Sequence, residues 1–146
     1  MTDDPWRPLY QRLQADLQQR IGFRLLTVLR LEGHRLMRAH SSDLTRYPPG
    51  GAKDIRGDAY LTQLVRDGVP VLSADEEAVR ARFFDHATIF AMGCGAVLNL
   101  PVCAPDGRTL GTLNLLHQAR WFGPQHVRLA APAVAELAAA WGEHGA

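Results

Sequence analysis

The chain has 146 residues, the size of one domain, and is long enough to bury a sizeable hydrophobic core. Hydrophobic residues make up 47% of it and charged residues 21%, which is ordinary for a soluble globular protein. The formal charge of +1 comes from scattered basic residues, so it gives no electrostatic case for binding nucleic acid or an anionic membrane.

Other features point to a cytoplasmic protein. The N-terminal residues lack the basic and apolar regions of a secretion signal, and no apolar run approaches the roughly 18 residues that span a bilayer. The two cysteines, Cys94 and Cys103, argue against a disulfide scaffold. On one strand they would lie about 30 Å apart, too far to form a disulfide.

The first third of the chain predicts a helix and a hairpin. Residues 5–20 form an amphipathic pattern, with Asp4 as the expected N-cap, Pro5 at the first helical position and Gly22 at the end. Residues 23–31 and 36–40 read as two strands joined by a turn at residues 32–35. Residues 41–57 are polar and rich in turn formers, and we expect them to form a loop that covers a functional site.

The middle of the chain predicts short elements. Residues 58–67 read as a helix that stops at Gly68, and residues 69–72 as a short strand. Helices are expected over residues 75–84 and 87–92, the second ending at Gly93. A last helix is expected from Pro124 to about Trp141, with Pro132 inside it. Its apolar stripe is predicted to contain Val127, Ala131, Val134, Ala138 and Trp141.

A second hairpin lies between these helices, from Val97 to His117, and its turn is residues 105–107. Proline, aspartate and glycine in this order suit a three-residue loop that pairs Ala104 with Arg108. Counting outward from the turn pairs Pro101 with Gly111. It also places Thr112 and Asn114 on one face and Asn99 on the other. Both faces are mostly apolar, which predicts a hairpin deep in a sheet that is covered on both sides.

The stretch V-L-N-L-P-V-x5-G-R-T-L-G-T-L-N-L-L-H, residues 97–117, resembles the GAF domain family, whose signature there includes a glycine at the position of Gly111. The helices and the first hairpin also follow the family order. The resemblance implies an α+β fold like that of GAF and PAS domains. A central antiparallel β-sheet would carry the N- and C-terminal helices on one side, with loops and short helices over a pocket on the other. It also implies dimerisation through the terminal helices.

Cys94, which lies between two glycines, is the candidate residue with the most reactive type of side chain, a thiol. Some GAF proteins attach bilin through a cysteine followed by histidine, but Gly95 follows Cys94 here. Stand-alone members of the family include free methionine-(R)-sulfoxide reductases, which use a thiolate and a resolving cysteine. The alternative is that Cys94 is a buried, inert side chain.

Four other residues are candidates for binding a ligand: Tyr47, His86, Thr112 and Asn114. Asp85 and His86 invite an acid–base interpretation, but neighbouring residues on a helix do not face each other, so a capping aspartate is the alternative. Thr112 and Asn114 share a face and can offer a hydroxyl and an amide to one molecule; alternatively, Asn114 satisfies a neighbouring backbone. The histidines show no metal-ligand spacing, so we expect no metal and no cofactor.

The sequence therefore favours one domain over residues 1–146, a small-molecule-binding, sensory or regulatory GAF-like module that is non-catalytic and has no fused output domain. We expect a cytoplasmic homodimer, with an unidentified small molecule and a possible separate protein partner, and without nucleic acid or membrane. Two alternatives stay open. One is a thiol enzyme that reduces methionine sulfoxide through Cys94; the other is a protein-interaction module with a vestigial pocket.

Overall fold

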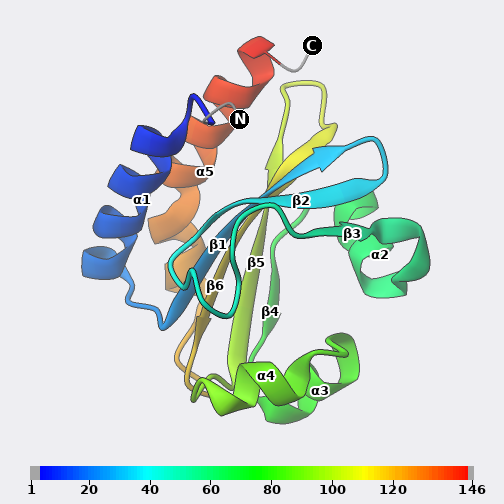
Figure 1. Ribbon diagram of the computed structural model, residues 1–146. Coiled ribbons are helices and arrows are strands. Elements are labelled where there is room, and N and C mark those ends of the chain that lie inside the picture. The colour runs from blue at the N-terminus through cyan, green and yellow to red at the C-terminus, as the bar shows by residue number, and fades with distance from the viewer. Residues whose placement is uncertain (1–3, 145–146) are drawn as a thin grey trace.

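The computed structural model describes residues 4–144 and has three layers (Figure 1). The helices are α1 (Arg7–Arg20), α2 (Ala59–Asp67), α3 (Glu76–Arg82), α4 (His86–Ala91) and α5 (Pro124–His144), with a 3-10 turn, η1, at Ile55–Gly57. The strands are β1 (Leu25–Glu32), β2 (Arg35–Ser41), β3 (Ala52–Asp54), β4 (Val71–Ser73), β5 (Ala96–Cys103) and β6 (Thr109–His117). Within residues 4–144 these strands form one antiparallel six-stranded sheet in the order β3-β2-β1-β6-β5-β4. This confirms the predicted α+β fold.

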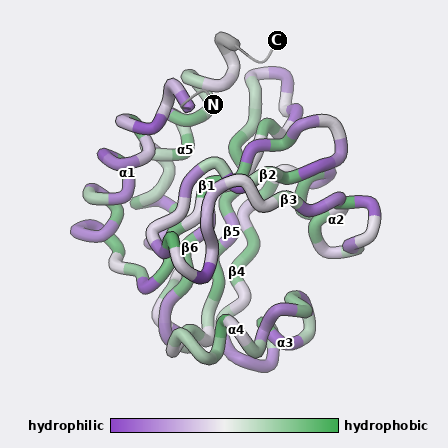
Figure 2. Tube along the Cα trace, viewed as in Figure 1, coloured by the Kyte–Doolittle hydropathy of each residue, from purple (hydrophilic) through white to green (hydrophobic). Residues whose placement is uncertain are grey.

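The main hydrophobic core lies between the sheet and the two terminal helices. Leu98, Leu113 and Leu115 of the central strands are fully buried against side chains such as Leu17 of α1 and Leu137 of α5. Figure 2 shows hydrophilic and hydrophobic colours alternating along α1, as expected for a helix with one buried face. The opposite face of the sheet carries α2, α3, α4 and the long loop.

Two apolar clusters lie on that opposite face. One holds α3 and α4 to the sheet, and the other holds α2. The first cluster is Leu25, Val79, Ile89, Cys94, Val97 and Leu116, and the second is Leu36, Leu61 and Leu64. Because helices are anchored at both ends of this face, the space between the clusters is open for a ligand.

Several predicted boundaries differ from the structure. α1 begins at Arg7 rather than Pro5, because the Asp4 carboxylate accepts the Trp6 N–H at 2.9 Å and holds the preceding turn. The predicted loop at 41–57 contains β3, which pairs with β2 at the sheet edge. β4 begins after Pro70, which lacks the N–H that a strand ladder uses.

The buried stripe of α5 also differs from the prediction. It consists of Ala130, Ala133, Leu137 and Trp141, whereas Ala131 is exposed. The predicted positions Ala131, Val134 and Ala138 each come one residue after a buried one, and one residue turns the side chain by about 100° around the helix. Val127, Val134 and Ala138 pack at the edge of the core as partly buried residues.

The most consequential difference lies in the central hairpin. The three-residue turn is as predicted: the Ala104 N–H donates to the Arg108 carbonyl at 2.8 Å, and Gly107 has φ of 90°. Beyond it, the register shifts by one residue at a β-bulge, so Pro101 pairs with Thr112 and not with Gly111. Leu110 is the extra residue, since Cys103 pairs with Thr109 but Val102 pairs with Gly111.

The bulge changes which side chains share a face. Asn99 lies directly opposite Asn114, so both project from the same face of the sheet, contrary to the prediction. On β1, Thr27 is the partner of Asn114. Three polar side chains from three neighbouring strands therefore meet on the side away from the terminal helices.

Candidate functional site

A cavity of about 260 Å³ lies on this face of the sheet, between the two apolar clusters and under the loop that follows β2. Its apolar walls come from the sheet, α2 and α4. Its lining residues are Leu25, Thr27, Leu29, Leu36, Arg38, Tyr47, Gly51, Ala52, Lys53, Asp58, Leu61, Leu64, Phe83, Asp85, Ile89, Val97, Asn99, Thr112, Asn114 and Leu116. The volume is slightly below the roughly 300–1,000 Å³ typical of sites for drug-sized ligands. The cavity therefore suits a small metabolite.

The floor of the cavity is a chain of hydrogen bonds between polar side chains of β1, β5 and β6. The Asn99 amide donates to Asn114 Oδ1 at 2.8 Å, and the Asn114 amide donates to Thr27 Oγ1 at 3.2 Å and Thr112 Oγ1 at 3.0 Å. The Tyr60 hydroxyl of α2 donates to Asn99 Oδ1 at 2.6 Å, and burial raises the pKa of Tyr60 to about 12. We call these five residues the polar floor.

The polar floor is buried but still faces the cavity. Thr27, Asn99, Thr112 and Asn114 are each at most 7% exposed, and all four line the cavity. Burying an amide without partners costs free energy, and the mutual hydrogen bonds offset that cost. A core that needed only stability could use leucine or valine at these positions, as the neighbouring positions of the same strands do.

The rim of the cavity joins the long loop to the segment before α4. The Tyr47 hydroxyl donates to Asp85 Oδ2 at 2.9 Å, which connects residues far apart in sequence. Burial raises the pKa of Tyr47, and the Asp85 carboxylate raises it further, so the phenol is protonated at neutral pH. The Arg38 guanidinium lies 5.0 Å from the centre of the Tyr47 ring and donates to the Pro48 carbonyl at 2.9 Å.

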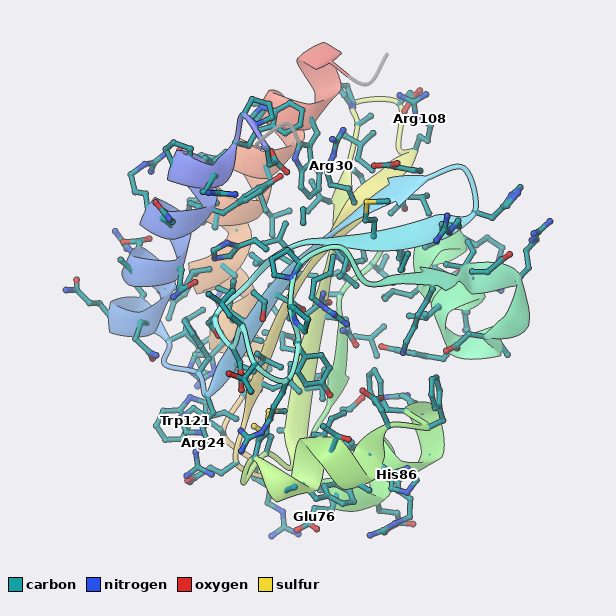
Figure 3. All side chains as sticks on the ribbon, in the orientation of Figure 1. Arg24, Arg30, Glu76, His86, Arg108 and Trp121 are labelled. Atoms are coloured by element: carbon teal, nitrogen blue, oxygen red, sulfur yellow. The ribbon has the colours of Figure 1, made fainter. Side chains whose placement is uncertain are left out.

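Three of the four predicted ligand-binding residues line this cavity: Tyr47, Thr112 and Asn114. His86 is not among the lining residues; its Nδ1 lies 2.7 Å from the Phe83 carbonyl oxygen, and its ring packs against Phe90. Figure 3 shows His86 at the lower edge of the molecule, beside α3 and α4. The neighbouring Asp85 lines the cavity instead.

Sequence reasoning missed Thr27, Arg38 and Asn99 as residues of the site. The register predicted from the turn places Asn99 on the wrong face because it contains no bulge, although Gly111 inside a strand is a recognised sign of one. Thr27 and Arg38 lie in a strand pattern that looks unremarkable, and their place in the site follows only from strand order.

Cys94 lies outside the cavity and is buried, with 3% of its surface exposed. Burial raises the pKa of its thiol, outweighing the opposite effect of Arg24 and Arg46. A nucleophilic cysteine needs a lowered pKa and access to its substrate. Both cysteines are free thiols. Cys94 precedes β5 and Cys103 is the last residue of that strand, so no resolving thiol is close to Cys94.

We therefore expect Cys94 to be unreactive in the folded protein. In a Cys103→Ser variant, native Cys94 should react with a colorimetric thiol reagent at pH 8 more than about 100-fold more slowly than after unfolding in urea, because the thiolate is disfavoured and shielded. The matched variant Cys94→Ser leaves the half-buried Cys103, which should react faster. Equal rates for native and unfolded Cys94 would contradict the structural role.

Two further features of residues 4–144 bear on function. This part of the chain contains no group of three or more histidine, cysteine, aspartate or glutamate side chains arranged to hold a metal ion. None of its helices is both long and apolar enough to cross a membrane.

Comparison with known proteins places these observations in a family context. The family model described as GAF domain matches residues 7–141. No curated protein matches the sequence closely enough to be called a relative.

Similar folds occur among solved structures. The GAF domain of a two-component sensor histidine kinase from Bacillus halodurans is 11% identical, with a TM-score of 0.77 over 94% of this chain and 93% of that one. The red/green cyanobacteriochrome NpR6012g4, in its red light-absorbing state, is 15% identical, with a TM-score of 0.73 over 96% of each chain. The GAF-B domain of DevS from Mycobacterium smegmatis is 17% identical, with a TM-score of 0.67 over 94% of this chain and 93% of that one.

Proposed function

The chain belongs to the GAF domain family, and on this premise we propose that it is a non-catalytic sensory or regulatory module that binds a small molecule in the cavity between the sheet and α2–α4. The observation that carries the proposal is the polar floor, a set of buried hydrogen-bonding side chains at the bottom of an otherwise apolar cavity. Apolar walls with a few convergent polar groups are typical of small-molecule sites.

The structural neighbours support a sensory role. They include a sensor histidine kinase and a cyanobacteriochrome, which are proteins that respond to a signal. The cyanobacteriochrome is similar to this chain in fold only, at 15% identity. The cavity volume of about 260 Å³ favours a ligand smaller than the drug-sized molecules of typical sites.

We propose that the loop over residues 41–51 reports ligand binding. The loop is fixed to α4 by the Tyr47–Asp85 hydrogen bond and to β2 by the Arg38–Pro48 hydrogen bond. A ligand that contacts Tyr47 or Arg38 competes with or strengthens these bonds, so binding changes the population of the closed loop. Such a shift requires only that the ligand bind the two loop states with different affinities.

We also propose that the chain forms a homodimer through α1 and α5, which lie together on the face of the sheet away from the cavity (Figure 1). Leu129 of α5 is 39% exposed there and provides apolar surface for a partner helix. The guanidinium of Arg30 lies 4.5 Å from the Trp6 ring and 5.6 Å from the Trp141 ring, which joins β1 to both terminal helices. A movement of β1 on ligand binding would reach the dimer interface by this contact, and a separate protein partner would read the change.

We do not propose the thiol-enzyme alternative, because Cys94 is buried and lies outside the cavity. An interaction module with a vestigial pocket would have no need for buried amides at the base of the cavity. Purified protein can distinguish these functions, since native mass spectrometry detects a retained ligand and a thermal-shift screen of metabolites detects an added one.

Filling the cavity should abolish ligand binding without unfolding the protein. Leu29 of β1 lines the cavity and is half-buried, and its strand partners Arg38 and Thr112 line the cavity as well, so Leu29→Trp places an indole into the ligand space. A compound at 100 times its Kd should stabilise the wild type by about 2.7 kcal/mol, and this stabilisation should disappear in Leu29→Trp. The control is Ala59→Trp at the exposed start of α2, which should keep the response. If Leu29→Trp binds as well as the wild type, the ligand binds elsewhere.

A further inference from the structure

The polar floor has more hydrogen-bond donors than its internal bonds use. Its five side chains carry seven N–H and O–H donors, two on each asparagine and one on each hydroxyl. They form four bonds among themselves and none with any other group of residues 4–144, so three donors are unmatched within the part of the chain that the structure describes. The number is the same whichever way each amide is turned, because every internal bond uses one donor. An unmatched buried donor costs more than an unfilled second lone pair, so the floor favours a ligand that presents acceptors.

The loop side of the cavity is positively charged. Arg38 lines the cavity, and burial lowers the pKa of Arg38 against the opposing attraction of Tyr47 and Asp85. Lys53 also lines the cavity, with its ammonium 4.5 Å from the Phe84 ring. Neither cation forms an ion pair with any carboxylate of residues 4–144. A ligand that carries a negative charge would supply the missing counter-ion.

Two carboxylates also line the cavity, and they differ in whether their oxygens already have hydrogen-bond partners. Asp58 caps α2, accepting the Leu61 N–H at 3.0 Å, so its charge is stabilised by the helix N-terminus. Asp85 accepts from Tyr47 through Oδ2, whereas its buried Oδ1 has no partner within the part of the chain that the structure describes. Asp85 and Arg38 lie against the same phenol, one at its hydroxyl and one over its ring. Asp85 Oδ1 is thus a buried acceptor that a donor on the ligand would match.

These observations lead us to propose that the ligand is a small aliphatic carboxylate. Its charge is matched by Arg38, its oxygens accept the unmatched donors of the polar floor, and its apolar body packs against Leu29 and the leucines of α2. A carboxylate is suited to both tasks, because it has two oxygens with about four lone-pair sites and pairs well with a guanidinium. The inference rests on the proposed function and defines the chemical class of the ligand.

Two kinds of ligand share this chemistry: a plain acid, and an acid with an amino or hydroxyl group beside the carboxylate. In the second kind, the added donor would pair with Asp85 Oδ1. The two kinds can be compared with molecules of one carbon skeleton. Suitable probes are 4-methylpentanoate, leucine and 2-hydroxy-4-methylpentanoate, with 4-methylpentanamide as the neutral control.

Isothermal titration calorimetry with these four compounds tests the proposal. We expect at least one of the carboxylates to bind about 10-fold to 100-fold more tightly than the amide, the range for a charge-assisted hydrogen bond in place of a neutral one. Arg38→Met should remove this preference and Arg38→Lys should restore part of it. The matched control is Arg35→Met, which removes an exposed arginine of the same strand outside the cavity and should leave the preference intact.

The variant Asp85→Asn shows whether the ligand is a plain acid or an acid with an added amino or hydroxyl group. If leucine or the hydroxy acid binds most tightly and loses that advantage in Asp85→Asn, the added donor meets Asp85, and the carboxylate class stands. If the plain acid binds equally well, Asp85 takes no part, and the class again stands. Thermal unfolding of each variant verifies that it is folded before titration.

Three results would overturn the inference. The first is an amide that binds as tightly as the acids, and the second is an acid preference that survives in Arg38→Met. The third is no binding of any of the four probes while another compound of the metabolite screen does bind. In each of these cases the cavity still binds a small molecule, and the proposed function stands. If no compound binds at all, the proposed function itself fails.

Discussion

Gly111→Ala is expected to destabilise the fold by more than about 3 kcal/mol, because this position has no room for a methyl group. A Cβ there would overlap the carbonyl oxygen of Leu29 on β1 and would lie 2.8 Å from Cζ3 of Trp141. The carbonyl belongs to the neighbouring strand of the sheet, so it cannot move without breaking the β1–β6 pairing. Equilibrium unfolding in urea measures the loss.

The position of Gly111 also explains how α5 packs. Trp141 is only 1% exposed and lies on the sheet where Gly111 presents no side chain, and its indole N–H donates to the Tyr10 hydroxyl at 3.2 Å. Replacing Trp141 by Phe in the Gly111→Ala background should not restore stability, because the overlap with Leu29 remains. The matched control is Gly142→Ala, where an added Cβ would meet no atom of the described residues within 4 Å outside its own stretch of helix; it should be neutral or stabilising by up to about 1 kcal/mol. A loss below about 1 kcal/mol in Gly111→Ala would contradict the close β1–β6 approach.

Asn114→Leu is the second change with a large expected effect. It removes three of the four hydrogen bonds of the polar floor, and it leaves a second Asn99 donor buried without an acceptor. Leucine has the same number and branching of side-chain heavy atoms as asparagine and leaves no void, so the expected loss of about 2–4 kcal/mol comes from unpaired polar groups rather than from a cavity. Ligand binding should be lost as well, since the site's central amide is gone.

A double-mutant cycle separates these causes. Asn99→Leu alone also breaks the amide pair, but the double variant has no asparagine left unpaired. Its destabilisation should therefore be smaller than the sum of the two single values, by about 1–2 kcal/mol. Additive losses would show that the two amides do not interact. In that case the register with Asn99 opposite Asn114 would be wrong.

Local signals in the sequence were sufficient to predict most of the fold. Pro105, Asp106 and Gly107 predicted the turn of the central hairpin, and Gly68 predicted the end of α2. These residues act through their own backbone preferences, so no tertiary information is needed. The bulge at Leu110 has a tertiary cause, since Gly111 must approach both β1 and Trp141. The sequence showed the glycine but not what lies against it.

The site was predicted less completely than the fold, for the same reason. Thr112 and Asn114 lie on one strand, so their alternation was enough to place them on one face. Tyr47 and Asp85 are far apart in sequence and meet only because the loop crosses the cavity towards α4. His86 was chosen for its chemistry, but in the structure its neighbour Asp85 lines the cavity, because the short helix turns His86 towards Phe83.

The most direct test of the ligand site uses the composition of the chain. The sequence contains two asparagines, and both belong to the polar floor. Protein labelled with ¹⁵N at asparagine should therefore show two side-chain amide groups in a heteronuclear NMR spectrum. We predict that both shift on titration with the stabilising compound and saturate at its calorimetric Kd. A compound that binds stoichiometrically while both amide groups stay unchanged would contradict a ligand on the polar floor.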